Sequence, residues 1–166
     1  EQAPATQRYG FHALGVAVAL LLYLAGVGWK EAYFFLAVVS LVYLLFVWKV
    51  FRSSSRPSPL KHAVRIVAFV IPLSFFMCWL QPGHYVTWLH LIFIGCFGML
   101  TYAVATRVTL AHGSYSTDLE MSSPALTVFV AFLVLAMVSR LLYGFSSSSW
   151  KTGFLFLAAA FWILAV

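Results

Sequence analysis

The chain has 166 residues, of which 63% are hydrophobic and only 8% are charged. Soluble domains carry about 25% charged residues, so this composition excludes a disordered chain, a nucleic-acid-binding module and an ordinary soluble enzyme. Ten Lys and Arg residues against four Asp and Glu residues give a net charge of +6. Because the basic residues lie mostly beside apolar runs, we attribute this charge to membrane topology and expect no nucleic-acid partner.

Six apolar stretches follow one another along the chain. A membrane-spanning helix needs about 20 mostly apolar residues, because a ~30 Å hydrocarbon core is crossed at a rise of 1.5 Å per residue. The stretches that reach or nearly reach this length are residues 9–28, 32–51, 63–80, 85–111, 124–145 and 150–166. They predict an all-α membrane protein, a polytopic bundle of about six transmembrane helices in one domain over residues 1–166.

Both ends of the chain are unusual for a complete membrane protein. The chain begins EQAPATQRYG, with neither an initiator Met nor a signal peptide, and it stops at FWILAV inside an apolar run. We therefore expect the sixth helix to be truncated and the chain to be part of a longer multi-pass protein. Its partners are then the lipid bilayer and the remaining helices of that protein or of a membrane complex.

Consecutive spans alternate in direction, so their ends fall on two sides of the membrane. The membrane side that carries residue 9 is named side A, and the opposite one is named side B. Side A receives seven basic residues, Arg8, Lys49, Arg52, Arg56, Lys61, Arg65 and Arg107. Side B receives three, Lys30, Arg140 and Lys151. Since cytoplasmic loops carry an excess of Lys and Arg, we expect side A to be cytoplasmic.

Histidines are the most informative polar residues of the spans. No carboxylate lies within a span, which argues against a carboxylate proton relay and against paired-carboxylate catalysis. Neutral imidazole, by contrast, is a common ligand of transition metals and haem iron. The topology places His12, His62 and His112 near side A, and it places His84 and His90 near side B. We expect His84, which follows Pro-Gly in a turn, to be solvated.

The three side-A histidines, His12, His62 and His112, are candidate metal ligands because three separate helix ends each contribute one. An interfacial or capping role is the alternative for each, since the sequence has no His-x-x-His or His-x-x-x-His pair. His90 and His112 lie 22 residues apart in the fourth span. A uniform α-helix would place them within about 40° of one face and about 33 Å apart, which suggests two sites.

Two arginines and two glycines complete the set of candidates. Arg107 and Arg140 lie a little inside the side-A and side-B ends of their spans. Each either extends to the membrane surface or pairs with the acidic group of a ligand, such as a haem propionate, and composition favours the first role. Gly95 and Gly98 allow close helix contact. Cys78 and Cys96 are expected to be inert buried thiols.

The fourth span also carries a family resemblance. Its histidine-containing start at Leu89-His90, its Gly95-x-x-Gly98 centre, its Thr106-Arg107 pair and its Ala111-His112-Gly113 end resemble the most characteristic segment of the NnrS family. Further resembling segments follow the family's order, namely Leu60-Lys61-His62, Ser139-Arg140-Leu141 and Phe161-Trp162-Ile163-Leu164-Ala165. Ala111 replaces the usual Gly, and Ser114 stands where Thr-Gly would follow. The resemblance covers residues 60–166 well, but over residues 1–51 it is little more than apolar helix.

The resemblance implies a bacterial inner-membrane protein with many spans, of which this chain is the C-terminal half. It also implies haem and copper as cofactors and a link to nitric oxide metabolism or nitrosative-stress protection. Carried over by position, His90, Arg107 and His112 form the family's polar signature, followed by His62 and Arg140. His12 comes from the topology alone.

These observations lead to a haem- and/or copper-binding membrane protein as the first functional hypothesis. We assign His90, Arg107 and Arg140 to cofactor binding and His62, His112 and His12 to metal binding. The alternative is a non-catalytic membrane subunit of a larger respiratory or redox complex. A transporter is a weaker hypothesis, since the sequence shows neither an intramembrane carboxylate nor a broken helix. No enzymatic activity can be assigned from these residues.

Overall fold

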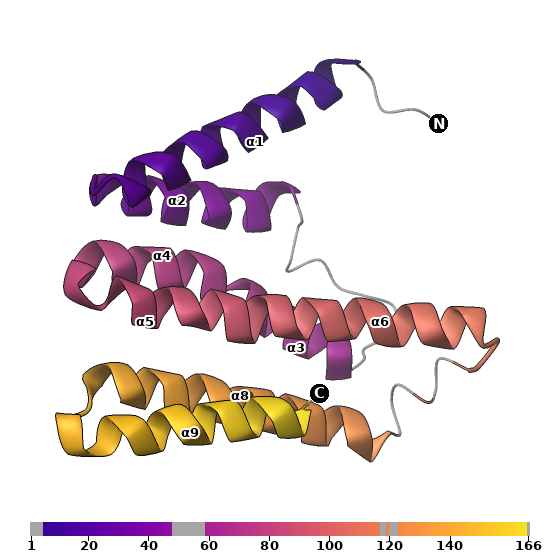
Figure 1. Cartoon of the computed structure of the whole chain (residues 1–166). Coiled ribbons are helices and arrows are strands. Elements are labelled where there is room, and N and C mark those ends of the chain that lie inside the picture. Colours follow the sequence, from indigo (N-terminus) through magenta and orange to yellow (C-terminus); the bar gives the residue numbers. More distant parts are fainter. Residues whose placement is uncertain (1–4, 48–58, 117–118, 120–122, 166) are drawn as a thin grey trace.

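The structure, a computed structural model, describes residues 5–47, 59–116, 119 and 123–165, with backbone alone at residues 5–9, 11, 12, 47 and 59. Within this part of the chain all regular structure is helical (Figure 1). The first two elements are α1 (Ala5–Gly26) and α2 (Glu31–Val42), and the π-helical segment η1 (Tyr43–Val47) continues α2. The remaining elements are α3 (Pro59–Ala68), α4 (Val70–Leu80), η2 (Pro82–His84), α5 (Tyr85–His90), η3 (Leu91–Phe97), α6 (Gly98–His112), α8 (Pro124–Phe145) and α9 (Ser148–Ala165).

The prediction of an all-α bundle with membrane-spanning helices is confirmed. Four described helical stretches are long and apolar enough to cross a membrane, Leu60–Leu80, Pro82–His112, Pro124–Phe145 and Ser148–Ala165. The first two predicted spans contain shorter apolar helices, Ala13–Gly26 and Glu31–Phe46. The fifth predicted span, residues 124–145, coincides with α8. The interval between the second and third predicted spans, residues 52–62, lies mostly outside the described residues.

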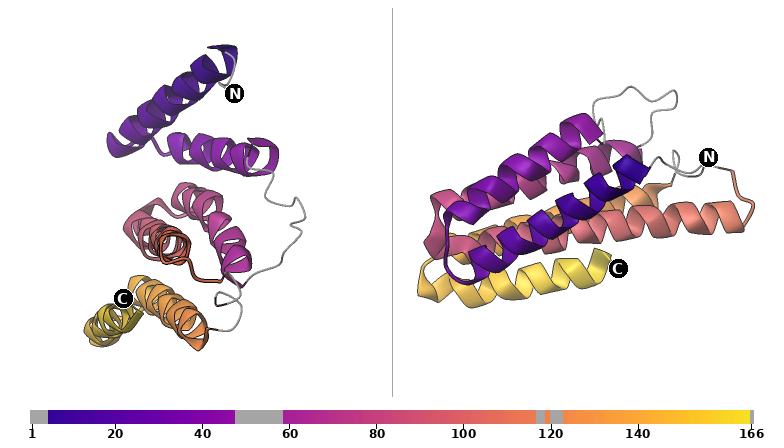
Figure 2. Two further views of the ribbon diagram at one scale, coloured as in Figure 1. Left: turned by 90° about the vertical axis from the view of Figure 1, so that its right-hand side faces the viewer. Right: turned by 90° about the horizontal axis from the view of Figure 1, so that it is seen from above.

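The helical stretches alternate in direction along the chain and form three successive layers (Figures 1 and 2). One layer is the hairpin of α1 and α2, the next combines α3–α4 with α5–α6, and the last is the hairpin of α8 and α9. The main contacts between layers join α2 to α4 and join α8 to α5 and η3. The turns after α1, α4 and α8 lie at one end of the molecule, at the left of Figure 1. This end is side B of the predicted topology, so the alternation of the spans is confirmed.

Breaks in the helices have local causes in the sequence. Pro72 lacks a backbone N–H, and its ring clashes with the carbonyl of Ala68, four residues earlier, in a regular helix. α3 accordingly ends at Ala68, and α4 starts at Val70. α1 ends at Gly26, and Gly28 then adopts φ +96°, which permits the backbone N–H of Trp29 to donate to the carbonyl of Leu24 at 3.0 Å. Ser123 and Pro124 lie at the start of α8, and the side chain of Ser123 makes no cap hydrogen bond there.

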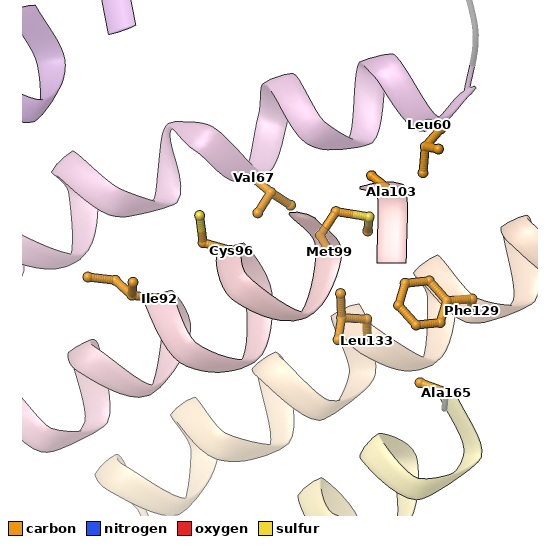
Figure 3. Packing of buried hydrophobic residues seen from close by; sticks show 9 residues of the cluster. All are labelled: Leu60, Val67, Ile92, Cys96, Met99, Ala103, Phe129, Leu133 and Ala165. Carbon is orange, nitrogen blue, oxygen red and sulfur yellow. The ribbon is translucent and has the colours of Figure 1, made fainter. Parts of the chain in front are cut away.

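The best-buried part of the bundle is apolar (Figure 3). Its cluster draws on α3, η3, α6, α8 and α9 and comprises Leu60, Val67, Ile92, Cys96, Met99, Ala103, Phe129, Leu133 and Ala165. Cys78 and Cys96 are both free and fully buried, as expected of inert thiols. Large apolar side chains also cover the outside, among them Val16, Phe46, Ile66, Phe156 and Ile163, each at least 70% exposed. Such an exterior fits a lipid bilayer, where apolar surface has no cost.

Candidate functional site

A polar pair crosses the interface between α5 and α8 near side B. His90 is the last residue of α5, and Arg140 lies in α8, 50 positions further along the chain. Nη2 of Arg140 lies 3.3 Å from Nε2 of His90. The structure thus brings together two of the three residues that the sequence analysis assigned to cofactor binding, a contact that was not predicted.

The partners of His90 determine its tautomer. The ring's Nδ1 lies 2.6 Å from the carbonyl oxygen of Val86, one turn earlier in α5. Arginine can only donate hydrogen bonds, so the Nε2 atom of His90 must accept the bond from Arg140. The proton of the neutral ring is therefore on Nδ1 and is donated to the Val86 carbonyl. This bond orients the imidazole and directs the Nε2 lone pair toward Arg140.

The guanidinium of Arg140 has more donors than partners. Its Nε and Nη1 atoms are buried, and neither has a hydrogen-bond partner among the described residues. The guanidinium carbon lies 4.4 Å from the centre of the Tyr143 ring, a cation–π contact. The expectation that Arg140 extends to the membrane surface is wrong for these nitrogens, because both are buried.

Two glycines hold the helices close on either side of this pair. A Cβ added at Gly144 would lie 2.8 Å from the Cβ of Thr87 and would overlap the rest of that buried side chain. On the other side, a Cβ at Gly95 would lie 2.6 Å from the sulfur of Met137. The packing role predicted for Gly95 is thus confirmed. Gly144 was missed, although its position four residues after Arg140 places it on the same face of α8.

An aromatic group lies between the pair and the side-B end of the helices. The ring of Phe145 lies 4.8 Å from that of His84 and 5.6 Å from that of Trp88. Trp88 also donates a hydrogen bond from Nε1 to Oε1 of Gln81, at 3.2 Å. His84 is exposed, as predicted, but it packs on Phe145. These rings therefore lie at the side-B end of the α5–α8 interface that holds Arg140.

The other candidate residues lie at the opposite end of the bundle. His62 on α3 and both Arg107 and His112 on α6 are exposed. His62 and Arg107 each interact with other groups of the chain. The side chain of His12 lies outside the described part, so the predicted three-histidine site stays a prediction. Among the side chains that are described, no group of three or more His, Cys, Asp or Glu residues could hold a metal ion.

The segment between His90 and His112 is not a uniform α-helix. Residues Leu91–Phe97 form the π-helical segment η3, in which each residue turns the chain through a smaller angle. The shared face expected for His90 and His112 was based on a constant 100° per residue, so that argument does not hold. Two separate ends of the helix remain, and at the side-B end the histidine contacts a second candidate residue, Arg140.

The comparison with protein families now adds to this geometry. The family model described as NnrS protein matches the chain over residues 1–166. The chain belongs to the NnrS family. The match includes residues 1–51, where the sequence resemblance showed little more than apolar helices. No curated protein and no solved structure matches the chain significantly. This NnrS-family chain is thus a helical membrane protein whose clearest polar contact within the spans joins His90 to Arg140.

Proposed function

We propose that this chain is part of a haem- and/or copper-binding protein of the bacterial inner membrane that acts in nitric oxide metabolism or nitrosative-stress protection. Membership of the NnrS family supports the link to nitric oxide. Four long apolar helices support a membrane location. The excess of basic residues on side A supports a cytoplasmic position for that side.

The hydrogen bonding of His90 is the observation that carries the cofactor proposal. Metal-binding histidines usually donate one ring N–H to a carbonyl or carboxylate, which leaves the other nitrogen as a well-oriented ligand. His90 has half of this arrangement, with Nδ1 on the Val86 carbonyl and an oriented Nε2 lone pair that now accepts from Arg140. His90 would therefore hold the iron of a haem through Nε2.

Arg140 fits the same group, because a haem also carries carboxylates. Arg140 now donates to Nε2 of His90, so it must give up this bond before Nε2 binds a metal. A haem propionate would take the guanidinium and at the same time supply acceptors for its unpartnered donors. A copper ion alone would instead meet a fixed positive charge. The described residues at side B therefore suit haem better than copper. When bound, haem supplies a metal that can take nitric oxide or transfer electrons.

Copper is the better candidate for side A, where imidazole is the available donor. His12, His62 and His112 are the proposed ligands, since imidazole nitrogen suits copper. Arg107 lies in the last two turns of α6, near His112, and would bind an acidic group of a cofactor there. Without His12, the described residues offer too few ligands for such a centre.

Spectroscopy and metal analysis of the purified full-length protein test this proposal. We expect a haem absorption spectrum, and we expect His90→Ala to lower the haem content while His84→Ala, an exchange of an exposed imidazole on the same side, leaves it unchanged. His62→Ala and His112→Ala should lower copper and leave haem unchanged. Absence of both haem and copper, under oxidising and reducing conditions, would contradict the proposal and favour a non-catalytic subunit of a larger complex.

A further inference from the structure

The charge of Arg140 has no counter-charge in the described part of the chain. Arginine stays protonated in proteins, so the guanidinium remains a cation in its buried position. The sequence has four acidic residues, and Glu31 is the only one of them that the structure describes. Glu31 begins α2, whose main contacts are with α1 and α4, not with α8. A buried cation with this little compensation is costly unless an anion accompanies it.

The neighbours of Arg140 orient the guanidinium without neutralising it. His90 accepts one hydrogen bond from Nη2, and the ring of Tyr143 lies against the guanidinium face. A guanidinium has five N–H donors, so the single bond to His90 leaves four. The buried Nε and Nη1 carry three of these four donors. Nε and Nη1 each share an edge of the planar guanidinium with Nη2, so a carboxylate or another small oxoanion can bind in its plane through Nη2 and either of them.

Close helix contacts lie on both sides of Arg140. Gly144 packs against Thr87 and Gly95 packs against Met137, so α8 lies close to α5 and η3. The ring of Phe145 packs on His84 and Trp88, and it lies between Arg140 and the side-B end of the helices. The donors are therefore preorganised, which lowers the cost of binding an anion.

We propose that Arg140, held by His90 and Tyr143, binds a carboxylate or small oxoanion at the α5–α8 interface. The anion is either a free oxoanion or the carboxylate of a bound cofactor. The second source rests on the proposed haem, whereas the first does not require it. In both cases the anion draws the guanidinium from Nε2 of His90, and this frees the imidazole lone pair.

Thermal unfolding of the purified full-length protein in detergent tests the free anion. Sodium nitrite and sodium formate, titrated at constant ionic strength, should raise the Tm of the wild type saturably, because a ligand that binds only the folded state stabilises it. Arg140→Gln should abolish this rise, and Arg140→Lys should weaken the apparent affinity at least tenfold because it loses the planar fork. Lys151→Gln is the matched control, a side-B cation on α9 that is exposed, and it should respond as the wild type does.

The Tm without anion separates a binding role from a structural one. Arg140→Gln removes a buried and uncompensated charge, so its Tm without added anion should equal or exceed that of the wild type. Tyr143→Leu, which removes the ring but not the charge, should weaken anion affinity about two- to fivefold, whereas Tyr143→Phe should keep it. A large loss of Tm in both Arg140→Gln and Arg140→Lys, without any anion response in the wild type, would mean that Arg140 is structural.

Reconstitution with haem and with haem dimethyl ester tests the cofactor carboxylate. The ester lacks free carboxylates, so the wild type should bind haem at least tenfold more tightly than the ester, and Arg140→Gln should bind the two equally. If the wild type binds no haem but responds to nitrite or formate, the proposed function fails and the anion site stands. If the wild type responds to neither anion and does not distinguish haem from its ester, the anion site is overturned.

Discussion

The helical stretch from Pro82 to His112 carries His90 toward side B and His112 at its side-A end, and the surroundings of these two histidines differ. His90 lies in the interface with α8, where its two ring nitrogens contact the Val86 carbonyl and Arg140. His112 ends α6 and is exposed, as is Arg107 on the same helix. Both ends therefore offer a histidine and an arginine, and at the side-B end the contact between them crosses from α5 to α8. Gly144 on α8 lets α5 approach closely there.

Gly144→Ala should give the largest effect on this difference between the two ends. The new Cβ overlaps the buried side chain of Thr87, whose own Cβ lies 2.8 Å away and does not move when the rotamer changes, so α5 and α8 must separate. We expect a loss of about 1–3 kcal/mol in the free energy of unfolding, together with loss of haem or anion binding at Arg140.

Gly153→Ala in α9 is the matched control for this substitution. Nothing lies within 4 Å of the Cβ that it would add. It should leave stability unchanged or raise it by about 0.5–1 kcal/mol, since Ala favours a helix over Gly. Thermal unfolding in detergent measures both variants. Equal stability of Gly144→Ala and Gly153→Ala would show that the contact with Thr87 does not hold the helices together.

Gly95→Ala should have a smaller effect than Gly144→Ala. The atoms that its Cβ would meet are the sulfur and terminal methyl of Met137, at 2.6 and 2.7 Å. Methionine is unbranched and flexible, so these atoms can move away at a cost of about 1 kcal/mol or less. The double variant Gly95→Ala with Met137→Ala, compared with Met137→Ala alone, measures this contact. A cost of Gly95→Ala that persists without the Met137 side chain would place the obstruction elsewhere.

His62→Ala and His112→Ala should have the smallest effects on stability. Both side chains are exposed, and surface exchanges usually change the free energy of unfolding by no more than about 0.5 kcal/mol. If the side-A histidines bind copper together with His12, each exchange, including His12→Ala, should lower the copper content similarly. A loss of copper in only one of the three would contradict a shared site.

The sequence predicted the fold more completely than the site. Residues 124–145 were bounded correctly because Ser-Pro starts that helix and serines end it, and both signals are local. The break between α3 and α4 was not predicted, although Pro72 was a visible cause. The π-helical segment η3 was missed because apolar residues such as those of Leu91–Phe97 are typical of an α-helix as well. His90 and Arg140 were each predicted to bind a cofactor, but their contact was not predicted. It depends on how α5 and α8 are aligned, and the two residues lie 50 positions apart in the chain.

The sequence by itself determined that this NnrS-family chain is a helical membrane protein with alternating spans. The reason is that a stretch of about 20 apolar residues can satisfy its backbone hydrogen bonds in lipid only as a helix. Only the tertiary structure decided which polar side chains meet. Contact between His90 and Arg140 requires the close approach that Gly144 and Gly95 permit, and it buries Nε and Nη1 of a guanidinium without a partner among the described residues. Because that burial depends on side chains from two helices at once, no single segment of the sequence reveals it.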